Sequence, residues 1–269
     1  MSTGSSVQDS MFSDGDRYEG FMGRWSREVA PLLVRFAMVR DGDTVLDVGS
    51  GTGALSTAIA TAAPSSRIVG IDPADSYVTA AQARRPAGRV QFEVGDAQQL
   101  RFADRSFDRA LSLLVLNFIP DRSRALREMI RVTRSGGVVA AAVWDYPEGM
   151  EMLRVFWDAA AALNPGADTR DERHMPLARQ GELGAFWDDH HLRDVTEEAL
   201  TIRMRFASFD DYWLPFLESQ GPAGSYVATL VASDREQLRA RLRRRLIGDG
   251  PDRPIELRGR AWAVRGTVR

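Results

Sequence analysis

The segment TVLDVGSGTGALS, residues 44–56, restricts the fold of this chain more than any other stretch. A short apolar run leads into glycines at alternate positions, Gly49, Gly51 and Gly53, and a helix-forming stretch follows. Glycine tolerates positive φ angles and lets a ligand approach the backbone closely. The free N–H groups at the start of the next helix would face that ligand. The pattern therefore predicts a strand–turn–helix unit with a nucleotide-type site.

Strands and helices alternate on both sides of this turn. Apolar patterns predict helices at 25–39, 54–63, 76–85 and 122–133, and strands at 44–48, 67–72, 89–96, 106–116 and 135–145. Repeats of this length are typical of a parallel sheet with helices on both faces. The first part of the chain is therefore expected to form a Rossmann-like α/β fold.

The regular alternation of short strands and helices ends after residue 145. We expect helices at 148–163, 177–190, 208–220 and 233–248, a loop at 164–172, and long strands at 193–206 and 255–268. Ser208 and Ser233 are expected to cap the last two helices. The two long strands can pair antiparallel at the sheet edge, which gives seven strands in a mostly parallel sheet with a helical cap.

This reading divides the chain into parts with different roles. Residues 1–17 are expected to be a mobile tail, because they are rich in Ser, Gly and Asp and show no periodicity. Residues 18–145, 192–206 and 254–269 are expected to form the cofactor-binding domain. Residues 146–191 and 207–253 are expected to form helical insertions that cap it and bind substrate.

Composition excludes several kinds of chemistry. The 269 residues include no cysteine, and all 35 basic residues are arginine. Thiolate nucleophiles, cysteine-bound metals, disulfides and lysine Schiff bases are therefore unavailable. A net charge of -2 gives no general attraction to nucleic acid. Neither a signal peptide nor an apolar run of membrane-spanning length is evident, so we expect a cytoplasmic protein.

Three acidic residues bear on which cofactor the glycines hold. Asp47 precedes them by two residues, and a carboxylate there would repel a pyrophosphate and attract an ammonium group. Asp72 ends the second predicted strand, where it can accept both hydroxyls of a ribose. Asp96 follows the third strand and can accept from an exocyclic amine, while the Ala97 N–H can donate to a ring nitrogen. A dinucleotide reading, Gly49-x-Gly51-x-x-Ala54, remains as an alternative.

Six motifs in order resemble the class I S-adenosylmethionine-dependent methyltransferases, of the small bacterial kind with a UbiE-like core. They are YEGFMGRWS, VLDVGSGTG, VGIDP, GDAQQLRF, SFDRALSLLVLNFIPD and ALREMIRVTRSGGVV, and they span residues 18–144. The resemblance implies S-adenosylmethionine as cofactor and S-adenosylhomocysteine as its product.

The resemblance also implies the residues that hold this cofactor. The glycines and Asp47 would hold its methionine part, Asp72 the ribose, and Asp96 with Ala97 the adenine. Leu113 would offer its carbonyl to the ammonium group, and the segment that starts at Tyr18 would close over the cofactor. The full set is Tyr18, Met22, Arg24, Trp25, Asp47, Gly49, Ser50, Gly51, Gly53, Asp72, Pro73, Asp96, Ala97 and Leu113.

No catalytic residue stands out. Relatives often carry a histidine after the fourth strand, where this chain has Asn117. Asn117, His190 and His191 are the candidates for orienting an acceptor or moving a proton, and no metal site is expected. Because ligand pockets are mostly apolar, the cap is expected to contribute aromatic side chains, with residues 209–213, FDDYW, as the expected source.

The sequence therefore predicts methyl transfer to an oxygen, nitrogen or carbon of a small, partly apolar acceptor. The expected partner is a small molecule, with neither nucleic acid nor a membrane involved. One alternative is a nicotinamide-dependent oxidoreductase, and another is a non-catalytic S-adenosylmethionine-binding protein. The identity of the acceptor and the oligomeric state stay open.

Overall fold

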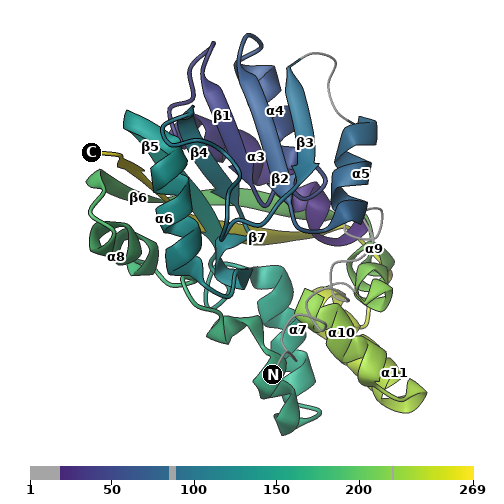
Figure 1. The fold of residues 1–269 in the computed structure, drawn as a ribbon. Helices are drawn as coiled ribbons and strands as arrows, with labels where there is room; N and C mark the ends of the chain where they lie inside the picture. Colours follow the sequence, from purple (N-terminus) through teal and green to yellow (C-terminus); the bar gives the residue numbers. More distant parts are fainter. Residues whose placement is uncertain (1–18, 85–88, 220) are drawn as a thin grey trace.

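The computed structural model describes residues 19–84, 89–219 and 221–269 (Figure 1). The predicted tail at 1–17 and the candidate Tyr18 lie outside these residues. Seven strands form one sheet in the order β3-β2-β1-β4-β5-β7-β6. Their bounds are β1 Thr44–Val48, β2 Arg67–Asp72, β3 Val90–Val94, β4 Phe107–Leu113, β5 Thr133–Trp144, β6 Arg193–Phe206 and β7 Ile255–Thr267.

The sheet is parallel from β3 to β5 and antiparallel beyond β5. Strand β1 pairs parallel with both β2 and β4, so the chain reverses its direction across the sheet at this point. Strand β7 lies antiparallel between β5 and β6, and β6 forms the edge. The predicted seven-stranded, mostly parallel sheet with an antiparallel final pair is confirmed. In such sheets ligands bind beyond the carboxyl ends of the strands, next to the point of reversal.

Helices cover both faces of this sheet. In Figure 1, α6 (Arg122–Val132) and α8 (Glu182–Asp189) lie in front of it, and α3 (Arg24–Phe36) lies behind it. Helix α3 packs beside α4 (Ala54–Ala62), and α5 (Asp75–Arg84) packs on β2 and β3. The middle of β5 has only small side chains, Ala140–142, all fully buried, and these let helices approach the sheet closely.

The remaining helices gather beyond the sheet, below it in Figure 1. They are α7 (Glu151–Ala161), α9 (Phe209–Trp213), α10 (Gly221–Thr229) and α11 (Ala232–Ile247), with short helical turns η3 (Pro165–Arg170), η4 (Glu172–His174) and η5 (Leu214–Glu218). Two more turns belong to the sheet domain, η1 (Glu19–Gly23) and η2 (Leu116–Phe118). We call the helices α7 and α9–α11 with η3–η5 the cap.

The structure confirms one predicted helix cap and corrects three other helix details. Ser208 caps α9 as predicted, since its hydroxyl accepts from the Asp211 N–H at 3.1 Å. The predicted cap at Ser233 is wrong, because α11 already begins at Ala232 and the extended Val231 precedes it. The helix predicted from residue 177 starts only at Glu182, after Gly181 at φ +85°.

The third detail is the helix predicted over 208–220. It changes from α-helix to a 3-10 turn at Leu214, next to Pro215, whose ring nitrogen has no hydrogen to donate. Among the residues that the structure describes, no helix has the length and apolar character needed to cross a membrane.

Candidate cofactor and acceptor site

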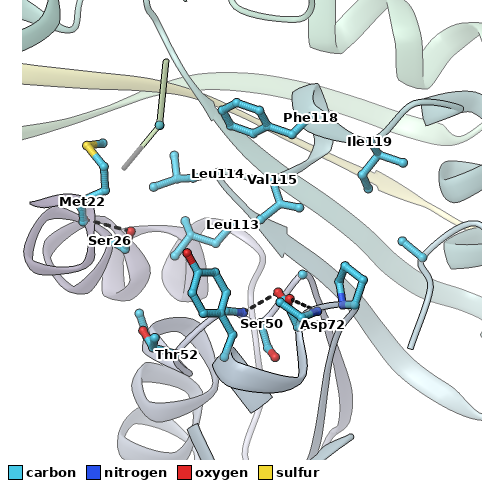
Figure 2. A pocket seen from close by; sticks show the side chains of 18 of the residues that line it. Met22, Ser26, Ser50, Thr52, Asp72, Leu113, Leu114, Val115, Phe118 and Ile119 are labelled. Carbon is cyan, nitrogen blue, oxygen red and sulfur yellow. Dashed lines mark hydrogen bonds between the residues drawn. The ribbon is translucent and has the colours of Figure 1, made fainter. Parts of the chain in front are cut away.

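A cavity of about 720 Å³ opens at the carboxyl ends of β1–β5 (Figure 2). Loops that follow these five strands line one side. The opposite side comes from η1, the start of α3, and the cap elements α7, η4 and α10. A volume of this size is in the range of cofactor and small-molecule sites. The cavity therefore lies between the sheet domain and the cap.

The glycine turn forms the floor beside β1. The N–H groups of Gly49 and Ser50 both donate to the carbonyl of Ile71, at 2.9 and 2.8 Å, which ties the turn to β2. A Cβ on Gly49 would lie 2.5 Å from a methyl of Val115, so only glycine fits there. Gly51, at φ +52°, has open space where its Cβ would be. Val115 therefore packs tightly against the turn at Gly49, whereas the turn leaves space for a ligand at Gly51.

Asp47 is a fully buried carboxylate in the wall of this cavity. Its Oδ2 accepts the backbone N–H and the hydroxyl of Ser56, at 3.0 and 2.7 Å. Its Oδ1 has no partner among the described residues, and neither has the buried hydroxyl of Ser50. Burial raises the pKa of Asp47 to about 7, because desolvation penalises the charged form. A cation at Oδ1 would favour the ionised carboxylate.

Asp72 and Asp96 occupy the ends of β2 and β3. Asp72 accepts the N–H groups of Gly51 and Ala74, at 2.9 and 3.0 Å, and burial raises its pKa. Asp96 is exposed at the rim, and its Oδ1 accepts the backbone N–H of Gln98 at 2.8 Å. Both carboxylates line the cavity, and Asp72 holds the glycine turn in place.

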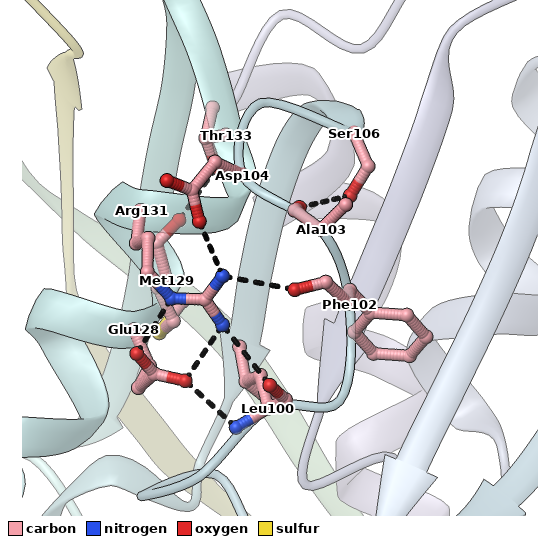
Figure 3. A network of polar contacts seen from close by, with 9 residues as sticks. All are labelled: Leu100, Phe102, Ala103, Asp104, Ser106, Glu128, Met129, Arg131 and Thr133. Carbon is pink, nitrogen blue, oxygen red and sulfur yellow. Dashed lines mark hydrogen bonds and ion pairs between the residues drawn. The ribbon is translucent and has the colours of Figure 1, made fainter.

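The loop that carries Asp96 is anchored by Arg131 on α6 (Figure 3). The guanidinium donates to the carbonyls of Leu100 and Phe102, at 3.0 and 2.9 Å, and forms ion pairs with Asp104 and Glu128. Glu128 also accepts the Leu100 N–H at 2.8 Å. Arg131 thus joins the β3–β4 connection, which also carries Asp96 at the cavity rim, to α6.

The wall after β4 and the cap side are mainly apolar. Figure 2 shows Leu113, Leu114, Val115, Phe118 and Ile119 along the wall that follows β4. The apolar residues that face them from other elements are Phe21, Met22, Trp144, Tyr146, Leu153 and Pro222. This half of the cavity suits an apolar body.

One buried acid interrupts the apolar half. Glu172 on η4 lines the cavity and is 3% exposed. Its carboxylate accepts the indole N–H of Trp157 and a backbone N–H of Ala223. Burial raises the pKa of Glu172 to about 8, outweighing these donors. Sequence reasoning missed this residue, because nothing in the local pattern distinguishes it from an acid in a solvated loop.

The cavity brings together most of the residues expected to hold the cofactor. Its lining includes Met22, Asp47, Gly49, Ser50, Gly51, Asp72, Pro73, Asp96, Ala97 and Leu113. Gly53, Arg24 and Trp25 are not among the described lining residues. Gly53 packs against Phe92 at the start of α4, and Trp25 packs against Phe206 at 5.2 Å. Their cofactor roles stay predictions.

Arg24 is engaged with the cap. Its guanidinium forms an ion pair with Asp211 at 2.8 Å and lies over the rings of Trp25 and Phe206. This contact joins the start of α3 to α9. The cofactor-binding role that the family resemblance implies for Arg24 would need the guanidinium to leave this partner.

The catalytic candidates lie outside the described lining. Asn117 is buried on η2, and its amide group has no partner among the described residues. His190 ends α8, and its Nδ1 lies 2.8 Å from the carbonyl of Phe186. His191 follows at φ +61° in the turn after α8, the helix that packs against β6 and β7. In the described part of the chain, no cluster of three acidic or histidine residues is arranged for a metal ion.

The expectation that residues 209–213 line the substrate pocket is wrong. Phe209, Tyr212 and Trp213 are buried in the interior of the cap and are absent from the lining. Tyr212 packs between Phe206 and Phe216, with ring centroids 5.3 Å from each. The short helix turns its aromatic face toward β6 and η5, so these rings stabilise the cap rather than the pocket.

The N-terminal turn is fastened to the glycine turn. The carboxylate of Glu19 on η1 accepts the hydroxyl of Thr52 and pairs with Arg27. Phe21 and Met22 on the same turn line the cavity. The first described residues therefore cover the cavity directly above the glycine loop.

These groups fit S-adenosylmethionine. A cationic amine can meet the unpartnered Oδ1 of Asp47, and the open space at Gly51 admits a close ligand. Acids stand at the ends of β2 and β3, where a nucleoside would lie. An acid in this position of the first strand would repel the pyrophosphate of a dinucleotide. Fold and site together define a Rossmann-like protein of the methyltransferase class.

Comparison with known proteins identifies the family. Residues 46–141 match the model of a methyltransferase domain. A demethylmenaquinone methyltransferase of Paenarthrobacter aurescens is 35% identical over 222 residues, which is 81% of this chain and 84% of that protein. The chain belongs to the S-adenosylmethionine-dependent methyltransferases, so the nicotinamide reading of its glycines is not the right one.

Other comparisons cover less or show the fold alone. The chain spans 42% of the length of an uncharacterized protein of Mycobacterium tuberculosis, at 32% identity over 118 residues. A putative methyltransferase of Bacillus halodurans superposes with a TM-score of 0.56 at 18% identity, covering 88% of this chain and 97% of that one. Phosphoethanolamine N-methyltransferase 2 of Haemonchus contortus, solved with S-adenosylmethionine, superposes with a TM-score of 0.56 at 17% identity. The match covers 90% of this chain and 52% of that one.

Proposed function

We propose that this protein transfers a methyl group from S-adenosylmethionine to an oxygen, nitrogen or carbon of a small, partly apolar acceptor. The observation that carries the proposal is one cavity with two unlike halves. Three acids and the glycine turn line the half beside β1–β3, whereas mainly apolar side chains line the half beneath the cap. A polar cofactor and an apolar acceptor can therefore lie side by side in it.

The cofactor would occupy the half beside β1–β3. When bound, S-adenosylmethionine would supply a methyl group on a sulfonium: the acceptor's electron pair forms a bond to the methyl carbon, the carbon–sulfur bond breaks, and a neutral thioether leaves. Oδ1 of Asp47 would bind the ammonium group, and the carbonyl of Leu113 would assist it. Asp72 would accept the ribose hydroxyls, and Asp96 with Ala97 would bind the adenine edge. Pro73 and Met22 would pack against the cofactor.

The acceptor would lie between the wall after β4 and the cap. We assign residues 146–191 and 207–253 to substrate binding and the rest of the described chain to the cofactor domain. Leu153 and Pro222 support this division, since they reach the cavity from α7 and α10. The demethylmenaquinone methyltransferase relative, by its name, methylates demethylmenaquinone. A related aromatic acceptor is compatible with the apolar lining.

Calorimetry and turnover test this function. S-adenosylmethionine and S-adenosylhomocysteine are expected to bind with micromolar affinity, and Asp72→Ala and Asp96→Ala are each expected to weaken that binding. A panel of phenols, quinols, amines and carboxylic acids should contain an acceptor that yields S-adenosylhomocysteine. A folded protein that binds neither cofactor form would disprove the proposal. Binding without turnover on any acceptor class would favour a non-catalytic role.

A further inference from the structure

Among the described lining residues, Glu172 is the one that contributes a carboxyl group from the cap. The other three acids that line the cavity, Asp47, Asp72 and Asp96, stand in the strand loops on the cofactor side. The lining contributed by β5, by the segment after it and by α7 is apolar or aromatic and includes Trp144, Tyr146 and Leu153. An acid in such surroundings is costly unless it has a use there.

The surrounding cap holds Glu172 in one position. Trp157 donates its indole N–H from α7, and Ala223 donates a backbone N–H from α10. Trp157 is itself fixed between Phe156 and Tyr226, with ring centroids at 5.1 and 5.5 Å. Three elements of the cap therefore converge on this carboxylate.

Glu172 has no cationic partner in the described part of the chain. Its neighbour Arg173 pairs with Asp171 and Asp158, at 2.5 and 3.0 Å. Asp171 adds a negative charge beside it, which opposes ionisation. On α7, Arg154 donates to the carbonyl of Glu148, and α10 carries no charged residue. Among the described residues, no arginine forms an ion pair with Glu172.

We propose that Glu172 is the catalytic base that accepts the proton from a hydroxyl group of an aromatic methyl acceptor. This inference rests on the proposed function of the same cavity. The acceptor's O–H bond breaks, its proton forms a new O–H bond on the Glu172 carboxylate, and the electron pair stays on the acceptor. That pair, on oxygen or delocalised onto a ring carbon, attacks the methyl group of bound S-adenosylmethionine. The proton then passes from Glu172 to solvent.

Two features favour a hydroxyl over a cationic amine. A carboxyl with a pKa of about 8 is mostly protonated at neutral pH, which makes it a weak counter-ion for an ammonium group, and its ionised, proton-accepting form increases as pH rises toward 8. The same pKa lies closer to that of a phenol, about 10 for tyrosine, than an ordinary glutamate does, and proton transfer benefits from such matching. The apolar and aromatic side chains of the lining suit an aromatic ring.

The first experiment measures the carboxyl directly, without turnover. Infrared difference spectra of the protein with S-adenosylhomocysteine are expected to show a protonated carboxyl band that disappears with a midpoint near pH 8. The band should be absent in Glu172→Gln and present in Asp171→Asn, the control on the same segment. Trp157→Phe removes one donor and should move the midpoint to higher pH. A band that persists in Glu172→Gln, or an unmoved midpoint in Trp157→Phe, would overturn the assignment.

The second experiment uses 2-naphthol and 2-naphthylamine as probes. Glu172→Gln should weaken 2-naphthol binding about 10- to 100-fold, because a charge-assisted hydrogen bond is lost. Its kcat for hydroxylated acceptors should fall about 100-fold or more, with partial recovery in Glu172→Asp, while affinity for S-adenosylhomocysteine stays within about twofold. Asp171→Asn keeps the Glu172 carboxyl but removes a neighbouring negative charge, so its pH profile should keep its shape and shift to lower pH.

The outcomes separate the two proposals. Normal S-adenosylhomocysteine binding with unchanged naphthol affinity in Glu172→Gln would reject the base and leave the methyltransferase function standing. Faster methylation of 2-naphthylamine than of 2-naphthol by the wild-type protein would also reject the base. Loss of cofactor binding in the wild-type protein would instead reject the proposed function itself.

Discussion

One oxygen of the Asp47 carboxylate, which lines the cavity, accepts both the backbone N–H and the hydroxyl of Ser56, and the other oxygen has no partner among the described residues. Ser56 lies on the first turn of α4, so strand β1 and this helix fix the carboxylate together. The arrangement presents one preorganised acceptor atom in a desolvated site. A ligand with a cationic amine gains most from such an atom, because little reorganisation accompanies binding.

The first prediction concerns this free oxygen. Asp47→Asn keeps the size of the side chain and removes its charge, so affinity for S-adenosylhomocysteine should fall at least about 30-fold, or about 2 kcal/mol. Isothermal titration calorimetry measures the change. Asp108→Asn is the control, since Asp108 pairs with Arg134 at the opposite end of β4. Equal losses in both variants would contradict a specific role for Asp47.

Asp47 also makes stability depend on pH. Its pKa is raised from 3.8 to about 7 on folding, so its contribution to stability is fully present below about pH 4 and is lost as pH rises through 7. Without ligand, Asp47→Asn should therefore unfold at higher denaturant concentration than the wild-type protein at pH 8, and the difference should shrink toward pH 4. Urea titrations at several pH values test the sign. A difference that grows as pH falls would be inconsistent with a raised pKa.

The second prediction separates backbone strain from cofactor contact. Gly51 and Gly136 both have positive φ, +52° and +75°, and both have open space at the Cβ position. Alanine at either site should cost about 1–2 kcal/mol of unfolding free energy. Only Gly51→Ala should also weaken S-adenosylhomocysteine binding, because Gly51 lines the cavity and Gly136 lies at the start of β5. Similar affinities in the two variants would argue against close ligand approach at Gly51.

The third prediction concerns Arg131. Arg131→Ala removes the hydrogen bonds to Leu100 and Phe102 and the ion pairs shown in Figure 3, so unfolding free energy should fall by about 2 kcal/mol. Amide hydrogen exchange over residues 97–104 should accelerate more than exchange in β1. Arg127→Ala, an exposed position on the same helix, serves as the control. Uniform acceleration across the sheet would instead indicate global destabilisation alone.

The fourth prediction addresses Arg24 and Asp211. Because this ion pair is partly exposed, each single substitution, Arg24→Met or Asp211→Asn, should cost about 1 kcal/mol. The double variant should lose less than the sum, by about 0.5–1 kcal/mol. Thermal unfolding of the four proteins measures this coupling. Additive effects would show that the contact contributes nothing of its own, and a large loss of cofactor affinity in Arg24→Met alone would return Arg24 to the cofactor site.

Local patterns were sufficient for the sheet domain. The bounds of β1, β2 and β6 follow from short apolar or alternating runs, and the glycines marked the turn above β1. Asp47, Asp72 and Asp96 could be placed because parallel strands present their carboxyl ends on one edge. The same logic failed for the cap. The aromatic pattern of residues 209–213 is the same whether these side chains line a pocket or pack in a core, and the structure buries them in the cap.

The sequence by itself determined the fold class, the strand ends that meet at the cavity and the family to which the chain belongs. These depend on hydrophobic periodicity and turn chemistry, which act over a few residues. Tertiary structure alone decided that Glu172 is buried against Trp157, that Arg24 faces Asp211, and that Tyr212 belongs to the cap interior. Burial is set by segments far apart in the chain, and burial gives a carboxylate such as Glu172 its unusual proton affinity.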